Sequence, residues 1–290
     1  MKIANALYKN RETLGILNGE GFIPFTAIGI EAADINALLR DYSPEKLSSA
    51  VNGKAEKAEV LKEGEYILLA PIMRPAQDII CLGQNYYDHA VESMRFRKEA
   101  FAPARSPVYF SKRVNEAVAD KGKVDGHFDI VDSLDYEAEL AVIIGRDASK
   151  VRKEDVYDYV FGYTIINDIS ARNVQTAHKQ WYFGKSLDGF APMGPAIVTK
   201  DEIPGAPALD IKSYVNGELR QSANTGTLMY GIPYIISELS AGMTLKAGTI
   251  ISTGTPSGVG MGFEPPKFLK PGDEVVCEIE KIGRLTNYIV

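Results

Sequence analysis

The stretch from Ser133 to Gln175 reads SLDYEAELAVIIGRDASKVRKEDVYDYVFGYTIINDISARNVQ, and the rest of the fold is organised around it. From Tyr136 to Ile144 the residues alternate with a period of two, and both faces are apolar toward the end, which predicts a covered β-strand. The run from Val160 to Ile166 is apolar throughout, as expected of a second buried strand. This stretch therefore predicts two buried strands at the centre of the fold.

This stretch contains three carboxylates at positions where a buried strand usually has apolar side chains. Glu137 and Glu139 are two residues apart on one strand face, about 7 Å apart at the backbone, and Asp168 follows the second strand. Like charges this close disfavour ionisation, and a divalent cation removes the conflict. Mg²⁺ and Mn²⁺ prefer carboxylate oxygens and leave positions open for a chelating substrate. The pattern predicts a Mg²⁺ or Mn²⁺ site, with two solvated glutamates on an exposed strand as the alternative.

The composition is that of an ordinary globular protein. The chain has 290 residues, of which 45% are hydrophobic and 24% are charged, enough for one large domain or a medium domain with a small partner. A net charge of −6 offers no basic stripe for nucleic acid and no polybasic patch for a membrane. Cys81 and Cys277 are far apart and predict buried thiols in a reducing compartment. Without an apolar leader or a spanning run, the expected location is the cytoplasm.

The pattern of strand, helix and turn signals divides the chain into two regions. Residues 1–72 alternate short strand signals with helical stretches at 33–40 and after Ser43-Pro44, where Ser43 is the expected cap, and they predict a small accessory α+β domain. Residues 76–290 are richer in strands and tight turns, including Asn216-Gly217, with one helix near 231–241. All the chemistry described below falls in this second region, which is therefore the predicted catalytic domain.

A helical segment with Asp88 as its expected N-cap carries His89 and Glu92 three residues apart, so their side chains share a face. A carboxylate that holds an imidazole fixes its orientation and raises its basicity, which suits a general base for water. A surface helix with an incidental His and Glu is the alternative. The basic run from Arg95 to Pro107 that follows is interpreted as a lid over an anionic ligand, or else as an ordinary loop.

The tripeptide Gly184-Lys185-Ser186 is not a nucleotide-binding loop, because the glycine needed five residues before Gly184 is replaced by Lys179. Lys185 is interpreted as a cation beside the metal, with a surface lysine as the alternative. Near the C-terminus, a buried strand is predicted at 249–253. The Gly-Thr-Pro turn after it offers backbone donors and the Thr255 hydroxyl to a carboxylate.

Four segments occur together in this chain: CLGQNYYDHAVE (81–92), the stretch quoted first, FGKSLDGFAPMGP (183–195) and STGTPSGVG (252–260). In this combination the chain resembles the fumarylacetoacetate hydrolase family over residues 76–290. The resemblance implies an α+β, mostly β fold, in which a mixed β-roll catalytic domain follows the small N-terminal domain. It also implies a homodimer and a mobile cover that carries the catalytic dyad.

The resemblance also assigns roles to residues. It implies metal ligation by Glu137, Glu139 and Asp168. The catalytic positions it implies are His89, Glu92, Lys185 and Gln175. The substrate-binding positions are Thr255, Gly254, Arg172 and Tyr86. Asn173 replaces the aspartate usual in the family, which puts in doubt a local ion pair with Arg172.

The predicted function is divalent-metal-dependent cleavage of a C–C bond in a small β-diketo acid, such as an acylpyruvate or fumarylpyruvate. The metal would chelate the substrate, and water activated by the His-Glu pair would attack its distal carbonyl. The alternatives are an oxaloacetate decarboxylase, or an isomerase or decarboxylase of an unsaturated dicarboxylate. A ligand-binding protein without turnover is disfavoured, because candidates for base, metal ligands and cation are all present.

Overall fold

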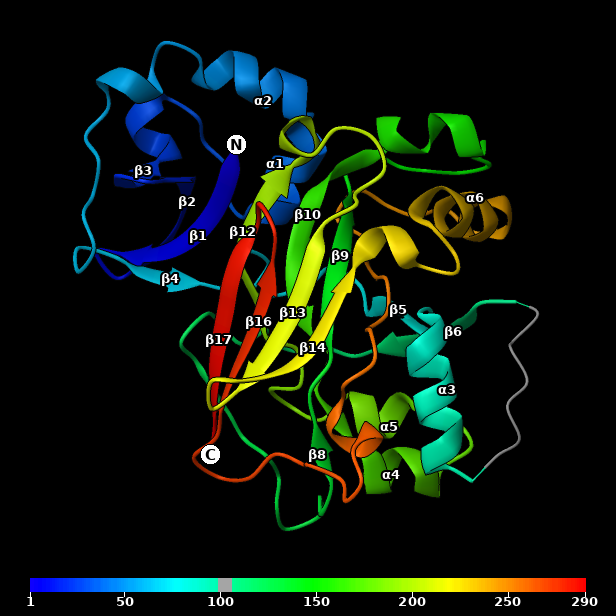
Figure 1. Cartoon of the computed structure of the whole chain (residues 1–290). Coiled ribbons are helices and arrows are strands. Elements are labelled where there is room, and N and C mark those ends of the chain that lie inside the picture. Colours follow the sequence, from blue (N-terminus) through cyan, green and yellow to red (C-terminus); the bar gives the residue numbers. More distant parts are fainter. Residues whose placement is uncertain (99–105) are drawn as a thin grey trace.

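The computed structural model describes residues 1–98 and 106–290 (Figure 1). The segment predicted to be a lid, Arg95 to Pro107, lies largely outside the described residues. The fold is α+β and mostly β, as predicted. Within the described ranges, no helix combines the length and the apolar character needed to cross a bilayer.

The larger sheet orders its strands β3-β2-β1-β12-β10-β9-β15-β5-β6, with β4 paired to β1, which makes ten strands among the described residues. Strand β15 runs parallel to β5, whereas β9 and β10 are antiparallel. The bounds of these strands are β1 Lys2–Tyr8, β2 Arg11–Asn18, β3 Gly21–Pro24, β4 Ile67–Leu69, β5 Ile79–Gly83, β6 Val108–Lys112, β9 Ala138–Ile144, β10 Val160–Asn167, β12 Met193–Thr199 and β15 Ile250–Ser252.

A second sheet, ordered β14-β13-β16-β17-β7, packs against the first, and β11 pairs with β8 near the site. The bounds of these strands are β7 Lys123–Val124, β8 Leu134–Asp135, β11 Ser170–Ala171, β13 Asp210–Val215, β14 Glu218–Asn224, β16 Glu274–Ile279 and β17 Gly283–Ile289. The α-helices are α1 Ile35–Asp41, α2 Pro44–Val51, α3 Tyr87–Phe96, α4 Arg172–Ala177, α5 Tyr182–Lys185 and α6 Ile232–Gly242. Short 3₁₀ helices are η1 Phe25–Ile28, η2 Ala55–Lys57, η3 Lys153–Asp158, η4 Lys200–Glu202, η5 Thr225–Thr227 and η6 Gly260–Gly262.

Strands β9 and β10 are buried along their whole length, as predicted. Alternate side chains of β9 point to two different cores. Leu140 and Val142 belong to the cluster that includes Ile211 of the second sheet. Ile143 belongs instead to the cluster that includes Leu38 of α1. Because both faces of the strand are covered, the sequence is apolar on both sides of the alternation.

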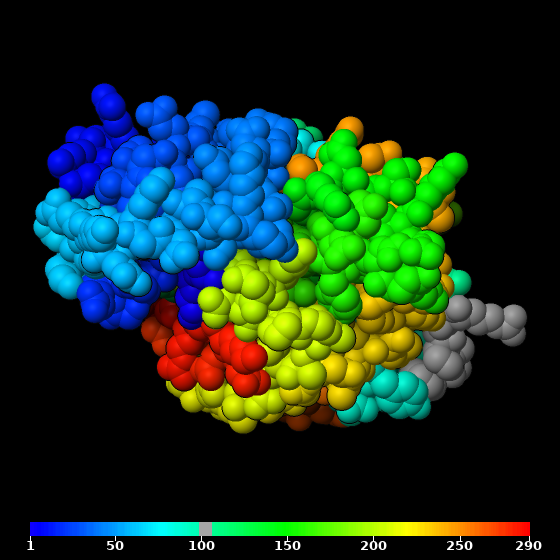
Figure 2. Space-filling view, turned by 90° about the horizontal axis from the view of Figure 1, so that it is seen from above, coloured from blue at the N-terminus to red at the C-terminus, as the bar shows by residue number. Residues whose placement is uncertain are grey.

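The N-terminal segment joins the same sheet. Strand β1 pairs with β12, Lys2 opposite Val198 and Ile3 opposite Ile197, so the first three strands extend the sheet (Figure 1). Figure 2 shows this segment in blue at one end of the molecule. The side chain of Ser43 accepts from the backbone N–H of Lys46 at 3.2 Å, which confirms it as the cap of α2. The division into domains 1–72 and 76–290 stays a prediction.

Candidate active site and metal centre

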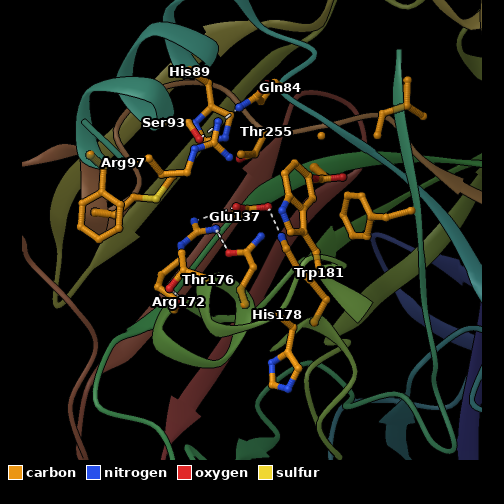
Figure 3. Close-up of a pocket in the computed structure, with 18 of the residues that line it drawn as sticks. Gln84, His89, Ser93, Arg97, Glu137, Arg172, Thr176, His178, Trp181 and Thr255 are labelled. Atoms are coloured by element: carbon orange, nitrogen blue, oxygen red, sulfur yellow. Dashed lines mark hydrogen bonds and ion pairs between the residues drawn. The ribbon is translucent and has the colours of Figure 1, made fainter. Parts of the chain in front are cut away.

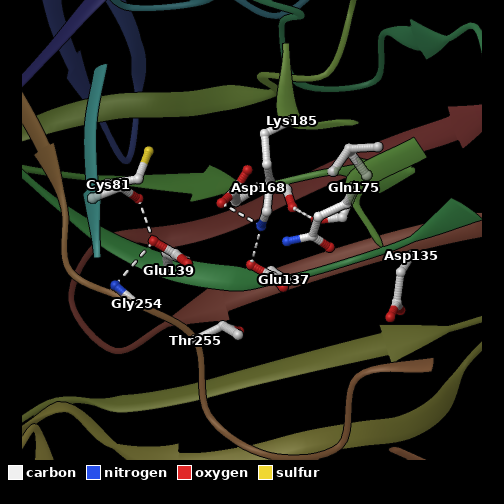
Figure 4. Close-up of polar contacts among 12 residues, drawn as sticks. Cys81, Asp135, Glu137, Glu139, Asp168, Gln175, Lys185, Gly254 and Thr255 are labelled. Carbon is white, nitrogen blue, oxygen red and sulfur yellow. Dashed lines mark hydrogen bonds and ion pairs between the residues drawn. The ribbon is translucent and has the colours of Figure 1, made fainter. Parts of the chain in front are cut away.

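The three predicted carboxylates converge at the ends of β9 and β10. The antiparallel register sets Ile166 opposite Glu139, and the backbone N–H of Asp168 donates to the carbonyl of Glu137 at 2.8 Å. Glu137, Glu139 and Asp168 are all buried, and one carboxylate oxygen from each lies within 4.8 Å of the others. Figure 4 shows the three side chains around one small space.

Lys185 sits between two of these carboxylates. Its Nζ donates to Glu137 Oε2 at 2.7 Å and to Asp168 Oδ2 at 2.8 Å (Figure 4). Burial alone would lower the pKa of Lys185, but Asp168 and Glu137 raise it, so the ammonium stays charged. Gly184 makes this position possible, because a Cβ there would lie 2.5 Å from the backbone nitrogen of Gln175 on α4. Lys185 is therefore a buried cation of the site and not a surface lysine.

A second buried lysine, Lys112 at the end of β6, was not predicted. Its Nζ forms an ion pair with Asp168 Oδ1 at 2.8 Å. It donates to the backbone carbonyls of Ile169 at 2.9 Å and Phe190 at 2.6 Å. The Lys112 ammonium is thus the partner of Asp168 Oδ1, as the Lys185 ammonium is of Oδ2. Two lysines hold the two oxygens of the Asp168 carboxylate in a fixed orientation, and carboxylate oxygens are ligands that hard divalent cations prefer.

The two glutamates differ in their electrostatics. Burial would raise the pKa of Glu137, but Lys185 and Arg172 outweigh it and hold that pKa below its usual range. Burial and the carboxylates of Asp168 and Glu137 raise the pKa of Glu139 well above its ordinary value. Glu139 accepts from the hydroxyl of Ser252 and from the backbone N–H of Gly254 at 3.0 Å. Three crowded oxygen ligands with this charge conflict fit a divalent cation held by Glu137, Glu139 and Asp168.

Replacing Glu139 by glutamine should stabilise the metal-free protein at neutral pH. The raised pKa means that the metal-free native state binds more protons than the unfolded state above pH 4.5, so wild-type stability falls as the pH rises. The glutamine side chain carries no charge, so the variant does not lose stability in this way as the pH rises. Melting temperatures in EDTA should therefore be higher for Glu139→Gln at pH 7, and the gap should narrow toward pH 4.5. Identical melting curves at all pH values would contradict the assigned environment.

Arg172, at the start of α4, donates hydrogen bonds from three N–H groups to other side chains of the protein. Nε donates to Asp135 at 2.9 Å, Nη2 to Glu137 at 2.7 Å and Nη1 to Gln175 at 3.1 Å. Asn173 takes no part, since its side chain donates to the backbone carbonyl of Ile130. Arg172 and Gln175 therefore contact each other as their spacing predicts. The ion-pair partners of Arg172 are Asp135 and Glu137, which precede β9, and not the residue at position 173.

The predicted dyad forms on α3. His89 Nδ1 lies 3.1 Å from Glu92 Oε2, and both side chains are largely buried. The other oxygen of Glu92 accepts from the backbone N–H of Gly258 at 2.9 Å. A Cβ at Gly262 would overlap the Glu92 carboxylate, so a larger residue there would displace Glu92 from this position. The prediction of Asp88 as N-cap was wrong: the helix begins at Tyr87, and no side chain caps it, so Asp88 lies within the first turn.

His89 of the dyad and the two glutamates of the triad line one cavity of about 300 Å³, whereas Glu92 and Asp168 are not among the residues that line it (Figure 3). The predicted residues that line it are His89, Glu137, Glu139, Arg172, Gln175, Lys185 and Thr255. The Thr255 hydroxyl, expected to hold a carboxylate, donates to the carbonyl of Ala138 at 2.9 Å and accepts from Gln221 at 2.7 Å. Gly254 contributes its backbone N–H to Glu139. Tyr86 is buried, and burial followed by the Glu139 charge raises the pKa of its hydroxyl.

Most of the other residues that line the cavity were not predicted. These other residues include Trp181, Phe110, His178, Lys179 and Arg97. Trp181 packs edge-on against Phe110, with ring centroids 5.3 Å apart. An acidic protein thus presents several cationic side chains to one small cavity, which favours an anionic ligand. Arg97 belongs to the basic run that is interpreted as a lid over an anionic ligand, whereas no periodic pattern marks the other four positions in the sequence.

Comparisons with known proteins show what this chain is similar to. Residues 78–290 match the family model "Fumarylacetoacetate (FAA) hydrolase C-terminal". The chain is 49% identical over 225 residues to oxaloacetate tautomerase YisK of Bacillus subtilis (strain 168), a match that covers 78% of this chain and 73% of that protein. It is 35% identical to the solved fumarylacetoacetate hydrolase EaFAH from psychrophilic Exiguobacterium antarcticum, with a TM-score of 0.86 over 100% of this chain and 99% of that one.

A third relative was solved with ligands. Maleylpyruvate hydrolase from Sphingobium sp. SYK-6, in complex with manganese(II) and pyruvate, is 29% identical. Its TM-score is 0.79, and the match covers 100% of this chain and 99% of that one.

Proposed function

Because the chain belongs to the fumarylacetoacetate hydrolase family, we propose that it is a divalent-metal-dependent enzyme that interconverts the keto and enol forms of oxaloacetate or a close relative. The observation that carries the proposal is that His89 of the His-Glu dyad lines the same cavity of about 300 Å³ as Glu137 and Glu139, two members of the buried carboxylate triad. A cavity of this size with a cationic lining suits a small dianion better than a bulky acyl group. The 49% identity to an oxaloacetate tautomerase supports the same substrate.

Glu137, Glu139 and Asp168 would hold the cation, Mg²⁺ or Mn²⁺. When bound, a divalent cation supplies Lewis acidity that lowers the energy of an enolate. The relative solved with manganese supports Mn²⁺ as one suitable ion. Lys185 and Lys112 keep Asp168 in place from two sides, so that the carboxylate is oriented before the ion arrives.

His89 is the proposed base. Glu92 binds Nδ1, which leaves Nε2 as the nitrogen that can exchange a proton with a ligand in the cavity. In the keto form of oxaloacetate the acidic proton is on C3, and we propose that His89 takes it there while the C2 oxygen gains a proton from water to give the enol. In the reverse direction the C2 hydroxyl loses its proton to water and His89 returns a proton to C3. Lys185 and Gln175, which line the same cavity, would stabilise the negative charge that develops on the C2 oxygen.

Acylpyruvate hydrolysis is the second candidate. The same dyad could activate water for attack on a distal carbonyl, and the maleylpyruvate hydrolase relative supports it. It ranks second here, reversing the order expected from sequence, because the identity to the tautomerase is 49% and to the hydrolase 29%. Oxaloacetate decarboxylation needs the same enolate and is a third outcome. A homodimer, as the family resemblance implies, is also proposed, and light scattering would test it.

The test is a substrate comparison with purified protein and Mn²⁺. We expect rapid conversion of enol to keto oxaloacetate, followed by absorbance, with little CO₂ release and slow cleavage of acetylpyruvate. Protein from which the metal has been removed is the matched control. Faster cleavage of acetylpyruvate than enol conversion would make hydrolase the better description. Fast CO₂ release would favour a decarboxylase.

A further inference from the structure

Asp135, the last residue of β8, is a fully buried carboxylate outside the predicted site. It accepts from Arg172 Nε at 2.9 Å. It also accepts from three backbone N–H groups, those of Tyr136 at 3.0 Å, Gly260 at 2.6 Å and Met261 at 3.1 Å. Four donors around one buried carboxylate fix its orientation.

Through Arg172, Asp135 is connected to the metal centre. The guanidinium lies between two carboxylates, with Nε on Asp135 and Nη2 on Glu137 Oε1. These two carboxylates raise the pKa of Arg172 against the effect of burial, so it carries a permanent charge. Asp135 therefore neutralises part of the positive charge that Arg172 presents to Glu137. It also fixes the plane of the guanidinium that orients this carboxylate.

Through its backbone donors, Asp135 is connected to the dyad. Gly260 and Met261 belong to the loop whose Gly258 N–H donates to Glu92 at 2.9 Å. The guanidinium of Arg95, also on α3, donates to the carbonyl of Gly262 in this loop. One buried carboxylate thus anchors both the loop that seats the dyad helix and the arginine that holds a proposed metal ligand.

We infer that Asp135 is a positioning residue that, by way of Arg172, sets how strongly Glu137 is available to the divalent cation. The inference rests on the proposed metal site but not on the identity of the substrate. Without Asp135, Arg172 would direct its full charge to Glu137 and compete with the cation for Oε1. The region would also gain one unit of positive charge. Loss of an outer-shell partner of this kind weakens metal binding by about 10- to 100-fold.

The test measures Mn²⁺ affinity from the electron paramagnetic resonance signal of free Mn²⁺, without any substrate. Asp135→Asn should bind Mn²⁺ at least about tenfold more weakly than wild type. Asp132→Asn is the matched control, because Asp132 is exposed and its side chain accepts from Ser133. It should leave the affinity within about twofold, since an exposed charge is screened. Wild-type affinity in Asp135→Asn would overturn the inference, whereas no Mn²⁺ binding by wild type would overturn the proposed function itself.

A double-mutant cycle tests the route through Arg172. In an Arg172→Gln background, Asp135→Asn should change the Mn²⁺ affinity by less than about threefold, because the intermediary is gone. A full tenfold loss in that background would show that Asp135 acts by another route and would overturn the assignment.

If Asp135→Asn does not fold, as judged by circular dichroism, the Arg172→Lys variant is measured in its place. A single ammonium cannot span both carboxylates, so the Mn²⁺ affinity should change at least about fivefold. An unchanged value would again overturn the inference.

Discussion

Asp168→Asn is expected to reduce oxaloacetate enol conversion by about a thousandfold or more. The amide removes one of three carboxylates from the proposed metal site and leaves Lys185 and Lys112 facing a neutral group. Lewis-acid stabilisation of an enolate is worth several kcal/mol, and each 1.4 kcal/mol corresponds to about a factor of ten in rate. The loss should therefore far exceed that from an ordinary change in packing.

Metal removal provides the comparison. Wild-type protein treated with EDTA should show a similar loss, and added Mn²⁺ or Mg²⁺ should restore it, whereas Asp168→Asn should stay inactive at the same concentrations. Asp129→Asn is the control and should retain full activity, because Asp129 is an exposed carboxylate that does not line the cavity. Full turnover after verified removal of the metal would refute a metal-dependent mechanism.

His89→Ala is expected to slow enol conversion by about 10² to 10⁴, the usual contribution of a general acid–base group. Keto–enol exchange requires a proton to move at C3, and acylpyruvate hydrolysis requires an activated water, so both reactions depend on the base. Decarboxylation does not, since CO₂ leaves once the C–C bond is aligned with the electron-accepting keto group. Any decarboxylation of oxaloacetate should therefore fall much less than enol conversion.

The measurement is a pair of rates on the same variant, enol conversion by absorbance and CO₂ release in a coupled assay. His127→Ala is the matched control, because its imidazole contacts the carbonyl of Asp188 at 2.9 Å and does not line the cavity. It should leave both rates near wild type. Equal losses in the two reactions from His89→Ala would contradict this division of roles.

Much of the core and part of the site could be predicted because the local sequence pattern indicates them. Strands β9 and β10 show their burial in an apolar alternation, and Glu137, Glu139 and Asp168 interrupt it. Lys112 and Asp135 gave no such signal. Lys112 is satisfied by the carbonyl of Ile169, 57 residues away, and by that of Phe190, 78 residues away. Asp135 is satisfied by a loop 125 residues later. Only tertiary contacts distinguish such residues from solvated charges.

The N-terminal segment illustrates the same point. Its strands and its caps follow from turn residues and propensity, as the Ser43 cap shows. Its attachment to the central sheet does not follow from them. The pairing of β1 with β12 depends on side chains that pack only after distant parts of the chain have met.

That pairing also sets an order of events during synthesis. Strand β1 emerges among the first residues, but its partner in β12 reaches residue 198. At about 5 to 20 residues per second, the ribosome takes roughly 10 to 40 s to supply it. Throughout that interval Lys2 and Ile3 offer unpaired backbone groups to any other nascent strand, whereas Asn5 to Leu7 pair with β4 much earlier in synthesis. Slow translation is therefore expected to promote aggregation of nascent chains, and a chaperone that covers the first strands should raise the yield of native protein.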